Sequence, residues 1–410
     1  MNKREVTEIK RRFKKEACTI SKMVGCYVDS GKQKVVTFRE SFLNLEEEEF
    51  HKYLEIVNKS LSGKLGNNLV ELEFPTETEI NGGPQQSLMA LRASHLDDDA
   101  MLESFYDHVI ETYDYVGNYL ILLFYDNYDV PLKTTDQLGL DESEEVYEYI
   151  ICAICPVALS KPGLGYNEEE NSISKLERDW VVGATDTAFL FPAFNDRSSD
   201  IHATLCYAKN PKEPHKEFWE NGLGCASKYT SVEKQTAFDT MVMKAVNAYD
   251  EEDAEDVLID VQTALNLYIE EETPLHEKDD PIILQANDIV PILTDGGVSE
   301  DKAEHIKKEY EEFFQDEMPE AEELLNAKIL KDNESRVEKK ILEEKVVELT
   351  DKLEEAGLIN DNGKDVDIVV RVSEEKLDQI STAFVDGQRC IVIPLLEDDA
   401  TTINAEPARF

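Results

Sequence analysis

The fold is decided by a run of hydrophobic residues, Asn118–Asp126, with the sequence NYLILLFYD. A short continuous apolar run is typical of a buried strand. Three further runs follow it, EVYEYIICAICPVAL, DWVVGATDTAFLFPAF and DIHATLCYAK, with turn-rich loops between them. Together the four runs predict a mixed or antiparallel sheet between residues 117 and 209. We expect helices to cover at least one of its faces.

The residues before this sheet predict a hairpin and two helices. Two β-rich runs around DSGKQ indicate a hairpin that turns near Ser30 and Gly31. A first helix is expected from a capping box at Asn44 and Glu47 to a stop at Gly63. A second is expected at about 98–114, after a loop PTETEINGGPQQ, with three Asp residues at its N-terminus. These elements predict an α+β core domain at 1–212, which ends at the sequence NPKEP.

The remaining residues predict three further parts. They are a helical domain at 228–318, an amphipathic helix at 335–356 and a small β-α-β-β module at 366–396. This module either stands alone or adds strands to the first sheet, and a frayed tail is expected after it. The amphipathic helix carries the heptad spacing of a coiled-coil seam, formed by Leu342, Val346, Leu349 and Leu353. It predicts either a helix packed within the chain or a homodimer.

The charge of the chain is unusual, because 88 Asp and Glu residues against 42 Lys and Arg give a net charge of −46. A field of this sign repels phosphate backbones and disfavours nucleic-acid binding in general. The N-terminus is the exception, since it holds the basic residues Lys3, Arg4, Lys10, Arg11, Arg12, Lys14 and Lys15. This basic arm is expected to dock on the protein's own acidic surface, on a partner protein or on nucleic acid.

A candidate functional site lies in the segment NDRSSDIH, where Asp196, Arg197, Asp200 and His202 fall close together. Carboxylates beside a histidine suit a divalent metal or acid–base chemistry. Asn, Asp and Ser are also the residues that a turn between strands requires. The segment is therefore either a hairpin turn or the site of an enzyme.

Other patterns indicate a protein without a cofactor. The chain has no phosphate-binding P-loop, no nucleophile elbow and no HExxH zinc motif. The one CxxC pair, Cys152 and Cys155, lies in an expected strand, where a separation of three residues puts the thiols on opposite faces. No apolar run approaches the roughly 20 residues that cross a bilayer, and no secretory signal is present. These features predict a cytoplasmic protein without membrane contact.

Four stretches resemble a known family of bacterial proteins. They are EIKRRFKKEACTISKMVGCYVD, ETYDYVGNYLILLFYD, ICPVALSKPGLGY and RDWVVGATDTAFLFPAFNDRSSDIH. The chain is similar in these stretches to domain-of-unknown-function family 4317. The resemblance covers residues 1 to about 320 and 366 to 395. It implies a bacterial cytoplasmic protein and assigns no catalytic residue.

Two functions agree with the sequence. The first is a non-enzymatic, acidic protein that binds another protein through the basic arm or the heptad helix. The alternative is a metal-assisted hydrolase or phosphoryl-transfer enzyme that uses Asp196, Asp200 and His202. Nucleic-acid binding through the basic arm is the weakest expectation.

Overall fold

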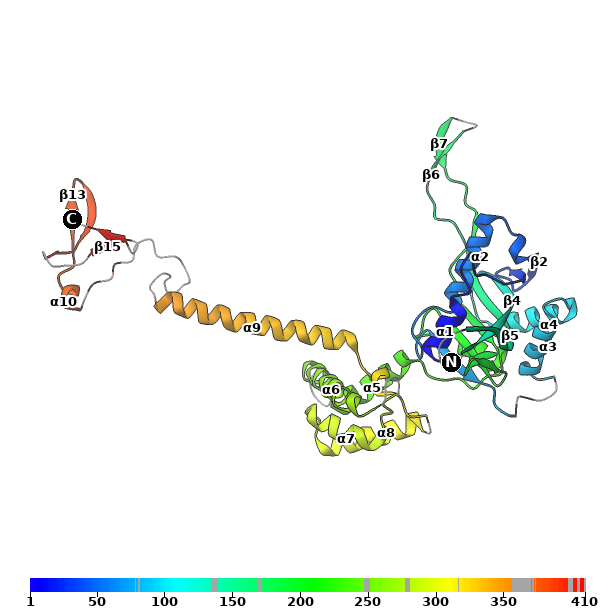
Figure 1. Ribbon diagram of the computed structural model, residues 1–410. Coiled ribbons are helices and arrows are strands. Elements are labelled where there is room, and N and C mark those ends of the chain that lie inside the picture. Colours follow the sequence, from blue (N-terminus) through cyan, green and yellow to red (C-terminus); the bar gives the residue numbers. More distant parts are fainter. Residues whose placement is uncertain are drawn as a thin grey trace. The chain divides into compact units, whose positions relative to one another are not determined.

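A computed structural model of the chain describes most of its residues (Figure 1). The described residues are 1–77, 79, 82–133, 139–168, 171–246, 251–276, 281–315, 317–355, 370, 372, 374–396, 401–403 and 406–408. They form two compact units, Met1–Ile329 and Leu330–Phe410. The finer division into four parts remains a prediction.

The first unit is built on an eight-stranded sheet in which every named pair of neighbours is antiparallel, which confirms the predicted α+β class. Its strand order is β2-β1-β4-β5-β9-β12-β3, and β8 pairs with β5 beside this path. The strands are β1 (Lys22–Val28), β2 (Lys34–Ser41), β3 (Leu69–Glu73), β4 (Asn118–Lys133), β5 (Gly139–Leu159), β8 (Trp180–Val182), β9 (Thr187–Phe191) and β12 (Ala203–Ala208). The hydrophobic run Asn118–Asp126 thus forms the first part of β4, with β1 on one side and β5 on the other.

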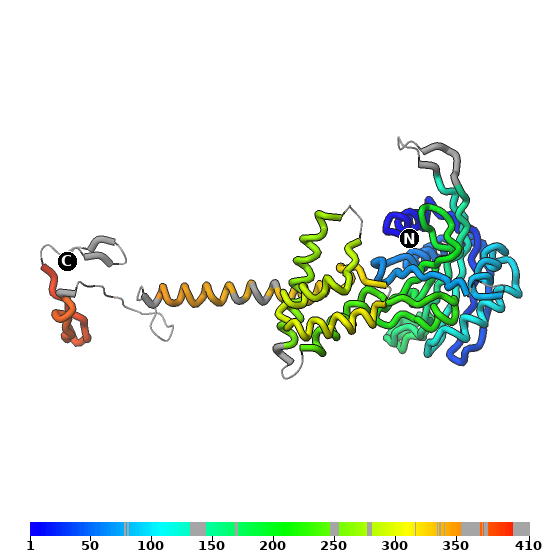
Figure 2. The backbone as a smooth tube through the Cα atoms, turned by 90° about the horizontal axis from the view of Figure 1, so that it is seen from below, coloured from blue at the N-terminus to red at the C-terminus, as the bar shows by residue number. Residues whose placement is uncertain are grey.

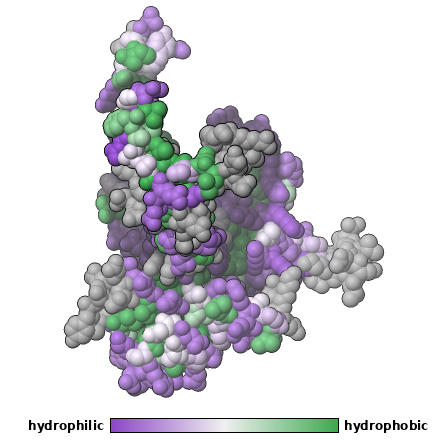
Figure 3. Space-filling model, turned by 90° about the vertical axis from the view of Figure 1, so that its left-hand side faces the viewer, coloured by the Kyte–Doolittle hydropathy of each residue, from purple (hydrophilic) through white to green (hydrophobic). Residues whose placement is uncertain are grey.

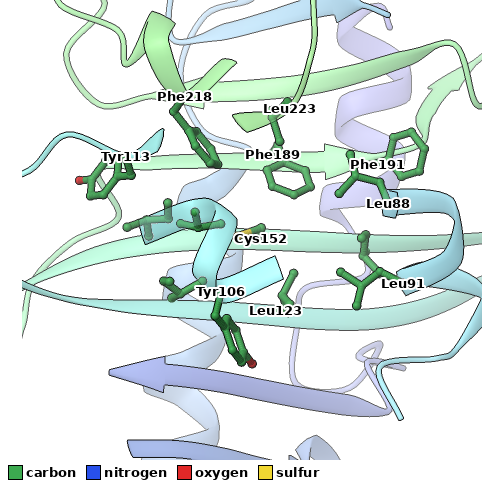
Figure 4. Close-up of a cluster of buried hydrophobic side chains, with 14 of the residues drawn as sticks. Leu88, Leu91, Tyr106, Tyr113, Leu123, Cys152, Phe189, Phe191, Phe218 and Leu223 are labelled. Carbon is green, nitrogen blue, oxygen red and sulfur yellow. The ribbon is translucent and has the colours of Figure 1, made fainter. Parts of the chain in front are cut away.

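Helices cover both faces of the sheet. One face packs against α3 (Pro84–Ala93), α4 (Asp99–Thr112) and the π-helical turn η2 (Phe218–Gly222), as Figure 4 shows. The other face packs against α1 (Lys3–Lys10) and α2 (Glu47–Ser60). Successive residues of β5 alternate between the two clusters, with Cys152 in one and Ile151 in the other. The apolar runs in these strands are continuous, without alternating polar residues, because both faces of the strands are buried.

In this unit, the predicted hairpin and the predicted helix after the three Asp residues are confirmed. The hairpin of β1 and β2 turns at residues 29–33. Asp98 is the N-cap of α4, where its side chain accepts a hydrogen bond from the Met101 backbone N–H. The predicted capping box at Asn44 is wrong, because residues 42–44 form a 3-10 turn with Phe42 buried. The N-cap of α2 is Glu46, two residues after Asn44, and the helix begins at Glu47.

The expected loop before α4 contains an additional helix. Pro84, within the stretch PTETEINGGPQQ, occupies the first turn of α3, a position that suits proline because its missing N–H has no helical partner there. The predicted end of the core domain at NPKEP also precedes residues that belong to its core. Phe218, Trp219, Leu223 and Cys225 join the cluster under α3 and α4.

Four helices form a third hydrophobic cluster, which runs from Phe238 to Leu324. They are α5 (Ser231–Val246), α6 (Glu251–Glu272), α7 (Ala286–Asp295) and α8 (Glu300–Phe314). The predicted start of α5 is confirmed, because Thr230 and Glu233 exchange side-chain hydrogen bonds with each other's backbone N–H.

The second unit contains most of α9 (Ala327–Glu355), one continuous helix (Figures 1 and 2). Beyond it lie α10 (Glu374–Leu377) and a hairpin of β13 (Ser381–Val385) and β14 (Gln388–Val392), which turns at Asp386 and Gly387. The first predicted strand of the module at 366–396 falls almost wholly outside the described residues. The tail expected to be frayed instead pairs β15 (Thr401–Ile403) with β16 (Glu406–Ala408).

Candidate functional site

The segment at residues 195–200 forms a tight hairpin turn. The strand β10 (Ala193–Asn195) pairs with β11 (Ser198–Asp200), and Asn195 lies opposite Ser198. Asp196 and Arg197 are the two loop residues, with φ of 49° and 60°. Two consecutive positive φ angles are what a two-residue hairpin loop of type I′ requires. The turn interpretation of this segment therefore describes its backbone correctly.

The side chain of Arg197 holds the N-terminal helix. Its Nη2 lies 3.0 Å from Glu8 Oε1, and its Nε lies 3.4 Å from Glu8 Oε2. Nη2 also donates to the Pro131 carbonyl oxygen at 3.0 Å. Glu8 in turn accepts a hydrogen bond of 2.8 Å from the Tyr128 hydroxyl. Arg197 thus joins the turn to α1 and to β4.

Asn195 and Asp200 form a second set of contacts across the turn. Asn195 Nδ2 donates to Glu71 Oε1 at 2.5 Å and to Asp200 Oδ2 at 2.8 Å. The Glu71 carboxylate also pairs with the α-amino group of Met1. The other oxygen of Asp200 accepts the backbone N–H of His202 at 3.0 Å. Both oxygens of Asp200 therefore have partners within the chain.

His202 lies near the surface, with 65% of its side chain exposed. Its Nδ1 is 2.6 Å from Glu79 Oε1, and this hydrogen bond raises the pKa of His202 above its usual value. Among the described residues, no three His, Cys, Asp or Glu side chains are grouped to hold a metal ion. The structure brings Asp196, Asp200 and His202 near one turn, but it directs Asp200 and His202 to different protein partners.

The basic N-terminal arm docks on its own domain. Val6, Ile9 and Phe13 are buried in the cluster under α1 and α2. Arg12 Nη2 lies 3.1 Å from Asp126 Oδ2, and Lys15 forms an ion pair with Glu47. The remaining basic side chains of the arm are exposed at Lys3, Arg4, Arg11 and Lys14 and half-buried at Lys10. Binding of these residues to a partner remains a prediction.

Sequence reasoning missed a polar cluster at the edge of the core. The Tyr113 hydroxyl donates to Asp186 Oδ2 at 2.8 Å, and His215 Nε2 lies 2.7 Å from the same oxygen. The hydrogen bond from His215 is the main reason why the pKa of Asp186 lies below its usual value, although burial opposes the shift. The three residues are far apart in the chain, so no local pattern could have found them. The cluster ties the segment after β12 to the end of α4.

Sequence reasoning also missed an exposed hydrophobic surface, because it interpreted the stretch LSKPGLGYNEEENS, residues 159–172, as a loop. These residues belong to an arm of two strands, β6 (Leu164–Asn167) and β7 (Ser172–Lys175), which stands away from the sheet (Figure 1). We define the apolar arm as seven side chains that are between 42% and 79% exposed: Leu164, Tyr166, Ile173, Leu176, Trp180, Val181 and Val182. Figure 3 shows hydrophobic patches of this kind within a largely hydrophilic surface. The alternation of apolar and polar residues in LGYN and SISK was the available signal.

The heptad residues of α9 are exposed as well. Leu342, Val346, Leu349 and Leu353 lie on one helix and are between 41% and 61% exposed. The structure therefore shows the predicted seam but no described residue that covers it.

The chain was compared with known protein families and with curated proteins. No curated protein is similar enough to this chain to be matched. None of the described helices is long and apolar enough to span a membrane. A family model described as "Domain of unknown function (DUF4317)" matches residues 1–405, which includes the helix at 335–356. The chain therefore belongs to the DUF4317 family.

Proposed function

We propose that this protein acts in the bacterial cytoplasm by binding an extended, apolar segment of another protein along its apolar arm. The exposure of the seven arm side chains carries this proposal. Soluble monomers rarely expose a contiguous apolar patch above a few hundred Å², and larger patches mark interaction sites. In a chain with a net charge of −46, such a patch stands out further.

The apolar side chains of the arm tip share one face. The pairing of β6 with β7 puts Tyr166 opposite Ile173 and Leu164 opposite Lys175. Residues two apart in a strand point to the same side, so Leu164, Tyr166 and Ile173 lie together. An isolated two-stranded hairpin is marginally stable in water, which favours a partner that covers this face.

The arm is continuous with an open sheet edge at β8. Backbone hydrogen bonds from Leu176 to Gly163 and from Ser160 to Asp179 connect the tip to the pair of β5 and β8. The Gly183 backbone N–H also donates to the Pro156 carbonyl oxygen at 2.7 Å. Residues 179, 181 and 183 therefore direct their backbone groups toward β5.

Alternation in an antiparallel pair then turns the backbone groups of Trp180 and Val182 toward the opposite edge. Among the described strands, β8 pairs with β5 alone. An extended segment of a partner can add to this edge through backbone hydrogen bonds, with side-chain pockets supplying specificity. A pocket of about 630 Å³ lies beside it, between α2 and residues 181–185. It can receive a side chain of the added strand.

The alternative enzymatic function at Asp196–His202 has less support. Asp200 is hydrogen-bonded to Asn195, and His202 is hydrogen-bonded to Glu79. Arg197 is hydrogen-bonded to Glu8. These contacts explain the segment as a docking point for α1. No contact in the turn requires a substrate to explain it.

The test is site-specific photocrosslinking in living cells. A photoreactive phenylalanine analogue replaces Tyr166 in one variant and Trp180 in another. Leu267 of α6 is the control position, because its side chain is 53% exposed but does not belong to the apolar arm. We expect the same crosslinked protein from positions 166 and 180 and none from 267.

A second variant tests strand addition. Val182→Pro removes a backbone N–H that points to the open edge, while the bonds of residues 181 and 183 to β5 stay in place. We expect the crosslink from position 166 to weaken in this background without a change in the thermal unfolding midpoint. Equal crosslinking from all three positions, or none from positions 166 and 180, would rule out the proposal.

A further inference from the structure

We infer that the exposed seam of α9, formed by Leu342, Val346, Leu349 and Leu353, pairs with the same seam of a second copy of this chain. This inference is independent of the proposed function, because it uses another surface and another partner. It makes the protein a homodimer through a two-stranded helical contact.

The exposure of α9 is an exception within the molecule. Every other described helix of 14 residues or more buries apolar side chains, as α8 does with Ile306, Tyr310 and Phe314. In α9 the four seam residues are 41% to 61% exposed, and no described residue covers them. The helix has no Gly or Pro across its 29 residues, so nothing in its sequence interrupts the helix that carries the seam.

The shape of the seam favours a single helix as its partner. Its residues step by 4, 3 and 4 positions, and at about 100° per residue they fall within a stripe about 60° wide. The buried residues of α4, by comparison, are Leu102, Tyr106, Val109 and Ile110, and they spread over about 100°. The wider stripe suits a helix that packs on a sheet, whereas a narrow one is typical of a coiled-coil seam.

The residue types in the seam favour a coiled coil of two helices. Leu342 and Leu349 occupy d positions, and Val346 and Leu353 occupy a positions. Val346 at one a position and Leu at both d positions match the combination of β-branched a and Leu d that favours a pair over larger bundles. Related by a two-fold axis, the same stripe meets itself, which is the usual form of a homodimer contact.

The local charge permits the contact although the whole chain is strongly acidic. Residues 327–355 hold nine acidic and seven basic side chains, against a net charge of −46 for the chain. Two of the lysines are already paired within the helix, Lys339 with Glu343 and Lys352 with Glu348. Two copies of α9 therefore repel each other little, and the remaining repulsion comes from the rest of the molecule. Added salt screens that repulsion and should strengthen the dimer.

The test measures the mass of the full chain in solution by sedimentation equilibrium at micromolar concentrations. The wild type should sediment with twice the chain mass of 46.6 kDa. Val346→Asp places a carboxylate in the seam and should raise the dissociation constant about 30-fold or more, because a polar group is then buried without a partner.

The matched control is Val347→Asp on the same helix. Val346 and Val347 are neighbours of the same type with exposures of 61% and 59%, so both changes alter helix propensity and net charge equally. Only Val346 lies in the seam, and Val347→Asp should leave the dimer intact. Circular dichroism should show equal helix content in both variants. A monomeric wild type, or equal effects of the two variants, would overturn the inference.

Discussion

Removal of the Arg12 charge should destabilise the first unit strongly, because it leaves a buried carboxylate without its counter-ion. Asp126 is 1% exposed and accepts hydrogen bonds from Tyr149 at 2.5 Å, Thr19 at 2.7 Å and its neighbour's backbone N–H at 2.9 Å. Arg12 is the one cation that pairs with it among the described residues. Loss of one partner of such a buried pair costs about 3–5 kcal/mol.

The variant is Arg12→Met, which keeps much of the side-chain volume. It also removes the contact between the guanidinium carbon and the Tyr128 ring, 4.3 Å from its centroid, which contributes a further ~0.5–1 kcal/mol. Chemical denaturation followed by tryptophan fluorescence should show a correspondingly lower apparent free energy of unfolding, since Trp219 lies in the core of this unit. Proteolytic cleavage within residues 1–20 should become faster as the arm detaches.

Two comparisons separate the charge from other effects. Arg11→Met changes an exposed neighbour and should alter the unfolding free energy by less than about 0.5 kcal/mol. The double variant Arg12→Met/Asp126→Asn should recover much of the loss, because no unpaired charge stays buried. A loss below about 1 kcal/mol in the single variant, or no recovery in the double one, would refute the reasoning.

Three further results are expected. Because Glu79 raises the pKa of His202, Glu79→Gln should return it toward about 6.5 in an NMR titration, and an unchanged value would exclude the contact. The pKa of Asp186 is lowered in the folded protein, so its ionised carboxylate stabilises the fold at pH values above the unfolded pKa of about 3.9. The difference in unfolding free energy between wild type and Asp186→Asn should therefore become smaller as the pH falls below about 3.9. Equal differences in unfolding free energy at about pH 3 and about pH 7, roughly one unit below and three units above the unfolded pKa, would contradict this reasoning. Gly296→Ala should lower the free energy of unfolding by about 1–3 kcal/mol, because a Cβ there would lie 2.6 Å from the Val261 Cα and force two helices apart. A thermal unfolding midpoint equal to that of the wild type would disprove this.

Much of the secondary structure could be predicted because it follows from the local spacing of apolar and polar residues. The run NYLILLFYD identified β4 without any knowledge of its neighbours. The turn at Asp196 and Arg197 was predictable for the same reason, since a short loop must be made of residues that tolerate positive φ. Errors arose where local signals competed, as at Asn44, where burial of Phe42 overrode a plausible cap.

The candidate site was harder to predict, because its contacts join distant parts of the chain. Arg197 follows Asp196 directly and lies three residues before Asp200, yet its carboxylate partner is Glu8, 189 residues away. The cluster of Tyr113, Asp186 and His215 also had no local signal.

The sequence by itself determined the α+β class, the acidic character, the main strands and the heptad stripe of α9, because each depends on residue type and spacing over a few turns or strand residues. Only the tertiary structure decided that helices cover both faces of the sheet, that Arg12 is paired with Asp126, and that the apolar arm is exposed. Whether a side chain is buried or paired depends on which distant segment packs against it. That choice belongs to the free energy of the whole fold rather than to any local stretch.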